Sequence, residues 1–144
     1  MIMKAHHTFI DHTADVLFEA EAPTLEELFE QCAIALEETQ VDVSSIKGNK
    51  EITITGKNKK IDQLLFDFLD DLVFHKDADL LIFNTFKIKI NQTSDGYKLE
   101  CKAKGDILDY KKHHPKVDVK AITMHMFEVK KIAGGWKAKV LVDI

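Results

Sequence analysis

The chain has 144 residues, of which 45% are hydrophobic and 31% charged, and its formal net charge is −4. This composition is typical of a folded domain and excludes a disordered chain. All 20 basic residues are lysines, and the excess of acidic side chains argues against a broad surface for nucleic-acid phosphates. We therefore expect one domain over residues 1–144 that does not bind RNA on its own.

The sequence also predicts where the protein resides. No stretch contains the roughly 20 consecutive apolar residues that a membrane-spanning helix needs. Residues 1–7 lack the long apolar core of a signal peptide. Cys32 and Cys101 each stand in an apolar pattern, which favours buried thiols over a disulfide. These features predict a soluble, cytoplasmic protein that has no membrane partner.

In the first half of the chain, strand patterns and helix patterns alternate. Residues 16–22 place apolar and acidic side chains on opposite faces, which predicts a half-buried strand. A capping box then precedes apolar residues at helical spacing, which predicts a helix over residues 25–39. A short strand at 51–55 is followed by a second amphipathic helix, whose apolar stripe covers residues 61–73.

The second half of the chain has the pattern of antiparallel strands. Residues 86–90 and 97–104 alternate around an Asp-Gly turn, and residues 119–129 and 136–142 flank a Gly-Gly turn. The order of the elements predicts an α+β fold, in which two amphipathic helices pack on a mainly antiparallel sheet as two layers.

The most unusual cluster of polar residues precedes the first strand. Asp11, His12, Thr13 and Asp15 bring two carboxylates, an imidazole and a hydroxyl together within five residues. The alternative is a structural turn, in which Asp11 and Thr13 bond to local backbone groups. On composition alone, the turn is the simpler interpretation.

The carboxyl end has a second unusual feature, because Asp143 stands beside the terminal carboxylate of Ile144. A strand held in a sheet would fix both groups, and their oxygens could then ligate a hard cation. The alternative is a strand end that frays into water. The histidines and cysteines lack the spacing of a zinc site, and no nucleophile has a distinctive setting. A hydrolase that uses Asp15 and His12 is therefore the weaker hypothesis.

Several motifs together resemble the archease family. The opening motif of that family is similar to residues 11–15 followed by 24–29, and its Leu-rich acidic helix is similar to residues 64–72. Its lysine-and-histidine loop resembles residues 112–115, and the similarity continues through residues 120–123 and the final Val-Asp-Ile. The motifs occur in the family's order along nearly the whole chain.

This resemblance implies a non-catalytic partner of the RtcB-type RNA ligase, which joins RNA ends during tRNA splicing with GTP and manganese. The partner promotes guanylylation of the ligase and its repeated turnover, and it meets RNA only through the ligase. The resemblance also implies a divalent-metal site on Asp15, Asp143 and Ile144, with His12 in the shell around it. We expect calcium, with magnesium or manganese as alternatives. A general chaperone or a specificity factor for RNA-modifying enzymes is the second hypothesis.

Overall fold

The computed structural model describes residues 3–12 and 14–144. In these ranges the chain forms strands, two long helices and one short 3-10 helix. In chain order they are β1 (His6–Ile10), β2 (Val16–Ala22), α1 (Leu25–Gln40), η1 (Val43–Ser45), β3 (Lys50–Asn58), α2 (Ile61–Asp79), β4 (Leu81–Thr93), β5 (Gly96–Ile107), β6 (Ala121–Ile132) and β7 (Gly135–Asp143).

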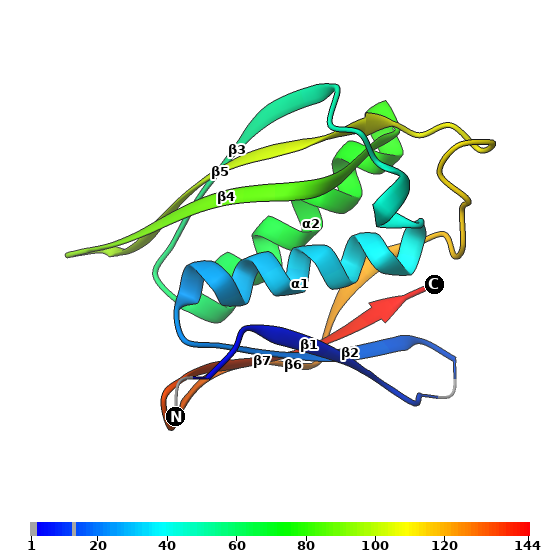
Figure 1. The fold of residues 1–144 in the computed structure, drawn as a ribbon. Coiled ribbons are helices and arrows are strands. Elements are labelled where there is room, and N and C mark those ends of the chain that lie inside the picture. The colour runs from blue at the N-terminus through cyan, green and yellow to red at the C-terminus, as the bar shows by residue number, and fades with distance from the viewer. Residues whose placement is uncertain (1–2, 13) are drawn as a thin grey trace.

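The strands form two antiparallel sheets with the orders β1-β2-β7-β6 and β3-β5-β4. Helix α1 contacts β4 of one sheet and β2 and β7 of the other, and α2 likewise contacts strands of both sheets. The two helices therefore lie between the sheets (Figure 1). The predicted α+β class, with two helices packed on antiparallel strands, is confirmed, and the strands that were expected to form one layer are divided between two sheets.

Helix α1 is buried on more than one side because both sheets pack against it. Its apolar stripe includes Leu28, Phe29, Cys32 and Leu36, each with no exposed surface. Phe29 stacks on Phe68 of α2, with 6.0 Å between the ring centroids. The main hydrophobic core thus joins both helices and both sheets.

The predicted capping box begins α1. The Thr24 side-chain oxygen accepts a hydrogen bond from the Glu27 backbone N–H at 3.2 Å, and the Thr24 hydroxyl donates to the Glu27 carboxylate at 3.0 Å. The cap satisfies a backbone donor that would otherwise be free at the first turn. Helix α2 extends to Asp79, further than the apolar stripe predicted, and ends where Leu80 adopts a left-handed backbone with φ 56°.

Two strand segments were not predicted. Strand β1 is largely exposed at the edge of its sheet, so it lacks the alternation that marks a half-buried strand. Strand β4 begins with three consecutive buried residues, Leu81–Phe83, and its register shifts at Asn84. The Asn84 side chain donates to the backbone oxygens of Val43 and Ile46, which ties this bulge to η1.

Cys32 and Cys101 are both buried and free, as predicted. In the described parts of the chain, no helix is long and apolar enough to cross a membrane.

Candidate functional site

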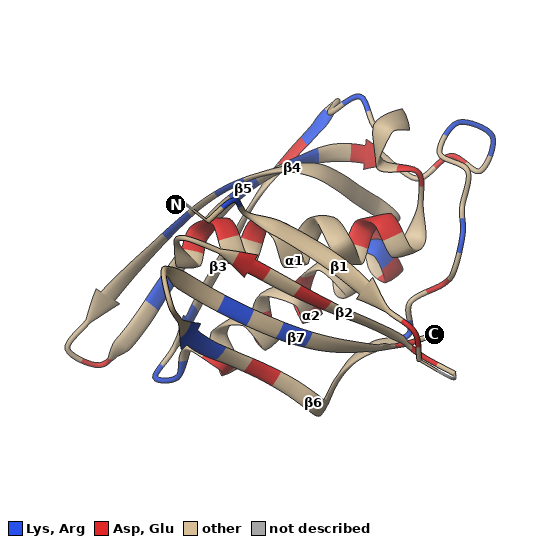
Figure 2. Cartoon of the chain, turned by 60° about the horizontal axis from the view of Figure 1, so that its bottom comes forward, with Lys and Arg blue, Asp and Glu red and all other residues tan. Residues whose placement is uncertain are grey.

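The structure places Asp15 and Asp143 at the same end of two neighbouring strands. Strands β2 and β7 run antiparallel, and Val16 is paired with Val142. Asp15 comes directly before Val16, and Asp143 directly follows Val142. Figures 1 and 2 both show the C-terminus at the end of the sheet where β2 begins. Two acidic residues that are 128 positions apart in sequence therefore lie at the same end of this sheet.

The carboxyl end is held in the sheet. Asp143 pairs with Ala121 of β6, and its backbone oxygen accepts a hydrogen bond from the Lys120 N–H at 2.8 Å. The Ile144 side chain is partly buried and packs against the main core. The terminal carboxylate is therefore fixed near Asp143, and the fraying strand end considered above is not what the structure contains.

His12 lies beside the acidic end but does not form a close pair with it. Its Nδ1 is 3.9 Å from Oδ2 of Asp15, and the two side chains are 31% and 29% exposed. This distance is beyond hydrogen-bond reach, so no direct hydrogen bond joins the two groups. Thr13, the fourth polar residue of the motif, lies outside the described residues.

The donor atoms at this end are all oxygens of acidic groups. Asp15, Asp143 and the terminal carboxylate of Ile144 can hold three negative charges, and in the described ranges none of them forms an ion pair with a lysine. Hard divalent cations prefer such oxygens. Among residues 3–12 and 14–144, no three His, Cys, Asp or Glu side chains are grouped for a metal. His12, Asp15 and Asp143 therefore do not form such a group, and the predicted set needs the terminal carboxylate of Ile144 as its third ligand.

A buried lysine of α2 fixes the segment that leads to this end. Lys76 Nζ donates to Oδ1 of Asp118 at 2.6 Å and to the Val119 backbone oxygen at 3.0 Å, and it also contacts Asp77 at 2.7 Å. Burial lowers the pKa of Lys76, but the two aspartates outweigh this effect and the pKa is raised. The neighbouring Lys120 N–H bonds to Asp143, so the ion pair positions the backbone beside the acidic end.

A second buried pair shapes the loop between β5 and β6. The His113 Nδ1 accepts from the Asp109 backbone N–H at 2.9 Å, so Nε2 donates to Oδ2 of Asp106 at 2.9 Å. Asp106 also accepts from the backbone N–H groups of residues 47, 48 and 49 at 2.8 to 3.1 Å. Burial raises the pKa of Asp106, but these hydrogen bonds outweigh burial and lower it to about 2.

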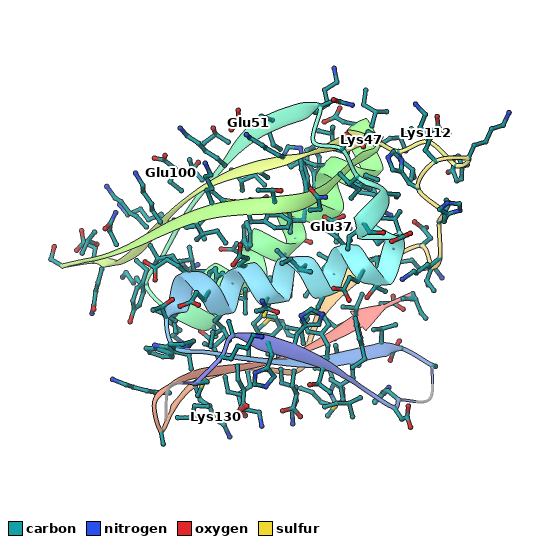
Figure 3. All side chains as sticks on the ribbon, viewed as in Figure 1. Glu37, Lys47, Glu51, Glu100, Lys112 and Lys130 are labelled. Carbon is teal, nitrogen blue, oxygen red and sulfur yellow. The ribbon has the colours of Figure 1, made fainter. Side chains whose placement is uncertain are left out.

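Beside this buried pair lies a surface hollow of about 680 Å³. The Asp106 and His113 side chains form part of its wall, and four lysines line it. They are Lys47, Lys50, Lys111 and Lys112. Figure 3 shows Lys47 and Lys112 at the end of the β3-β5-β4 sheet where the loop begins. Sequence reasoning missed the roles of Lys76, Asp106 and His113, because their partners lie far along the chain or in irregular loops.

The chain is similar to known proteins along nearly its whole length. The model of the "Archease protein family (MTH1598/TM1083)" matches residues 7–144. The chain is 38% identical to protein archease of Pyrococcus abyssi over 135 residues, which cover 93% of this chain and 95% of that protein. It is also 38% identical to protein archease of Methanothermobacter thermautotrophicus over 139 residues, which cover 94% of this chain and 96% of that protein.

Two solved structures are similar as well. The solution structure of Methanobacterium thermoautotrophicum protein 1598 matches with a TM-score of 0.86 and 36% identity, over 96% of this chain and 98% of that one. The crystal structure of an archease from Thermotoga maritima, described as a possible chaperone, matches with a TM-score of 0.60 and 20% identity over 94% of both chains, which supports the fold alone. The family match and these relatives show that the chain belongs to the archease family.

Proposed function

We propose that this chain is a non-catalytic, cytoplasmic activator of an RtcB-type, GTP-dependent RNA ligase in tRNA splicing. It promotes guanylylation of the ligase and lets each ligase molecule complete repeated rounds of joining. The observation that carries the proposal is the match to the archease family over residues 7–144. The pattern of ordered motifs that resembles that family supports it independently of any single residue.

The proposed working part of the protein is the acidic end of β2 and β7. Asp15, Asp143 and the terminal carboxylate of Ile144 would hold a divalent cation, and His12 would orient the surrounding groups. Calcium suits this site because it accepts six to eight oxygen ligands in flexible geometry, including water at a partly exposed position. Magnesium and manganese, which also prefer oxygen ligands, are the alternatives.

The bound cation can serve the ligase in two ways. It can help to place metal and charge near the nucleotide phosphates during guanylylation, which needs charge neutralisation. Alternatively, it ties the carboxyl end to the first strands and stabilises the surface that meets the ligase, because a ligand of the folded state stabilises that state. We favour the first role, since the strand pairing and the Lys120–Asp143 bond already hold the carboxyl end.

The test uses Asp15→Ala and Asp143→Ala, with Asp11→Ala as the matched control from the same exposed loop. For each protein, calcium binding is measured by titration calorimetry, and the melting temperature is measured with and without a chelator. The guanylylation of a cognate RtcB-type ligase is then measured in its presence. We expect both site variants to lose calcium binding and ligase stimulation while the control retains them. Loss of stimulation only in proportion to lost stability would instead support the structural role.

The second candidate function is that of a general chaperone or a specificity factor for RNA-modifying enzymes. One observation favours it, namely large apolar side chains left on the surface, including Phe74 at 61% and Met124 at 54% exposure. The Thermotoga maritima archease is also described as a possible chaperone. If this function holds, the chain should suppress aggregation of several unrelated unfolded clients, and Phe74→Ser should weaken the suppression.

A further inference from the structure

The outer face of the β3-β5-β4 sheet carries a concentrated positive charge. The pairing register places every second residue of the three strands on this face, which we name the lysine face. Its charged residues are Lys57, Lys87, Lys89, Lys98, Lys102, Lys104, Glu51 and Glu100. Six lysines against two glutamates give it a net charge of +4, although the whole chain has a net charge of −4.

This face is open to solvent, while the opposite face of the same sheet belongs to the core. All eight charged side chains are exposed, whereas Ile54, Leu99 and Cys101 on the inner face are buried. In Figures 1 and 3 the helices lie on the inner side only, and the labelled Glu51 and Glu100 point away from them. No other element of the described chain covers the lysine face.

The lysines on this face repel one another. Lys102 lies directly opposite Lys87, and Lys57 lies directly opposite Lys98. Like charges that face each other across a sheet are destabilising. In residues 3–12 and 14–144, none of the six lysines forms a salt bridge, even with the two glutamates. The register also places Lys104 opposite Glu51 and Lys89 opposite Glu100, so the two glutamates offset part of this repulsion. The net charge of +4 that remains on the face indicates a functional surface, whose ligand supplies the missing negative charge.

The chemistry of the face favours phosphate groups over an acidic protein. Protein interfaces are enriched in aromatic residues, methionine and arginine and depleted in lysine. The lysine face has no aromatic or arginine residue, and its uncharged positions are threonine or asparagine, such as Thr53, Thr55 and Asn91. Lys87 and Lys89 of β4 stand at alternate positions about 7 Å apart, and so do Lys102 and Lys104 of β5. Such a row suits the repeated charges of a sugar–phosphate backbone.

The face also continues into a second lysine-rich feature. Lys50 pairs with Gly105, which adjoins Lys104 at the end of the face. Lys50 also lines the 680 Å³ hollow, together with Lys47 and two loop lysines. The positive surface therefore extends along the sheet and around its end.

We infer that the lysine face binds the phosphate backbone of a nucleic acid directly and without reading its bases. The inference does not depend on the proposed ligase partner. It replaces the expectation that the chain does not bind RNA on its own, because that expectation used the net charge of the whole chain and the charges are in fact segregated. Since the side chains that stack on bases are absent from this face, the binding is weak and sensitive to salt.

The test is fluorescence anisotropy of a labelled, single-stranded RNA of about 20 nucleotides, titrated with this protein alone at several salt concentrations. The variant Lys87→Glu/Lys102→Glu reverses two positive charges in the middle of the lysine face. Lys130→Glu/Lys131→Glu makes the same charge change on β6, and Figure 3 shows Lys130 on the opposite side of the molecule. The milder Lys87→Gln/Lys102→Gln serves as a second face variant that removes the repulsion between the two lysines.

We expect wild type to bind with a Kd on the order of 10 µM at low salt, with a log–log salt slope of about −3 if four phosphates are neutralised. The face variant with two glutamates should bind at least ~10-fold more weakly, the glutamine variant should fall between, and the β6 control should stay within about twofold. DNA of the same sequence should bind like RNA. The inference would be overturned if wild type and both face variants bound the RNA equally well. It would also be overturned if polyglutamate displaced the RNA as effectively as polyphosphate of equal charge.

Discussion

The buried carboxylate of Asp106 should be a main determinant of the stability of the loops at one end of the molecule. We predict that Asp106→Asn destabilises the protein strongly at neutral pH. In the folded protein the carboxylate accepts three backbone N–H bonds and one from the His113 ring. An asparagine of the same shape would place an NH₂ group against these donors, and it would leave at least one of them without an acceptor.

The size of the effect follows from the pKa of Asp106. The hydrogen bonds lower this pKa from 3.8 to about 2, and each unit is worth about 1.4 kcal/mol, so the ionised group contributes about 2 kcal/mol. An unsatisfied buried donor adds a cost of about 1 kcal/mol or more. We therefore expect Asp106→Asn to lower the free energy of unfolding by about 3 kcal/mol at pH 7. Because the folded pKa is depressed, this contribution is complete above pH 4 and decreases as the pH falls towards 2.

The measurement is urea unfolding of wild type and Asp106→Asn at pH 7 and pH 3. The difference in the free energy of unfolding between the two proteins should be about 1 kcal/mol smaller at pH 3 than at pH 7. Asp95→Asn, in the exposed turn between β4 and β5, removes the same charge and should change stability by less than about 0.5 kcal/mol. This reasoning would be refuted if Asp106→Asn lowered the free energy of unfolding by less than about 1 kcal/mol at pH 7. It would also be refuted if the difference in free energy between the two proteins did not change with pH.

Three further predictions concern the core. Glu37 is fully buried, and burial raises its pKa to about 8 against the opposing effects of the Phe83 N–H, Gln40 and Lys76. The stability of the folded protein should therefore decrease as the pH rises from 5 to 9. Glu37→Gln should melt at a higher temperature than wild type at pH 9 but not at pH 5. An equal response of both proteins to pH would contradict this assignment. Burial also raises the pKa of the Cys32 and Cys101 thiols, so a disulfide reagent should react with neither cysteine in the native protein and with both in urea. Phe68→Ala should lower the free energy of unfolding, measured in urea, by about 3 to 5 kcal/mol, since Phe68 packs between Phe29 and Phe86. A loss below about 1 kcal/mol would show that the core collapses around the gap.

The sequence predicted the helices and the hairpins well, because each has a strong local signal. The capping box at Thr24 and the apolar stripes place both helices, and the Asp-Gly and Gly-Gly turns place the two hairpins. The division into two sheets could not be predicted in this way, since it depends on which strands pair across long distances. Exposed β1 and the fully buried start of β4 also lack a period of two, so pattern reasoning had no basis for them.

The candidate site shows the same division between local and distant information. The sequence singled out Asp15 and Asp143 as unusual, but only the pairing of β2 with β7 brings them to one sheet edge. The lysine face was missed because its charges alternate with apolar residues along three separate strands. Net charge averages over the whole surface, whereas the register of a sheet decides which charges gather on one side.

The measurement that most directly tests the proposed function is the number of RNA molecules joined per molecule of a cognate RtcB-type ligase, with GTP and excess RNA, in the presence and absence of this protein. We predict more joining events per ligase with this protein than without it, whereas the protein alone joins none. If a verified, folded preparation leaves both the yield per ligase and the rate of guanylylation unchanged, the proposed activator function is wrong.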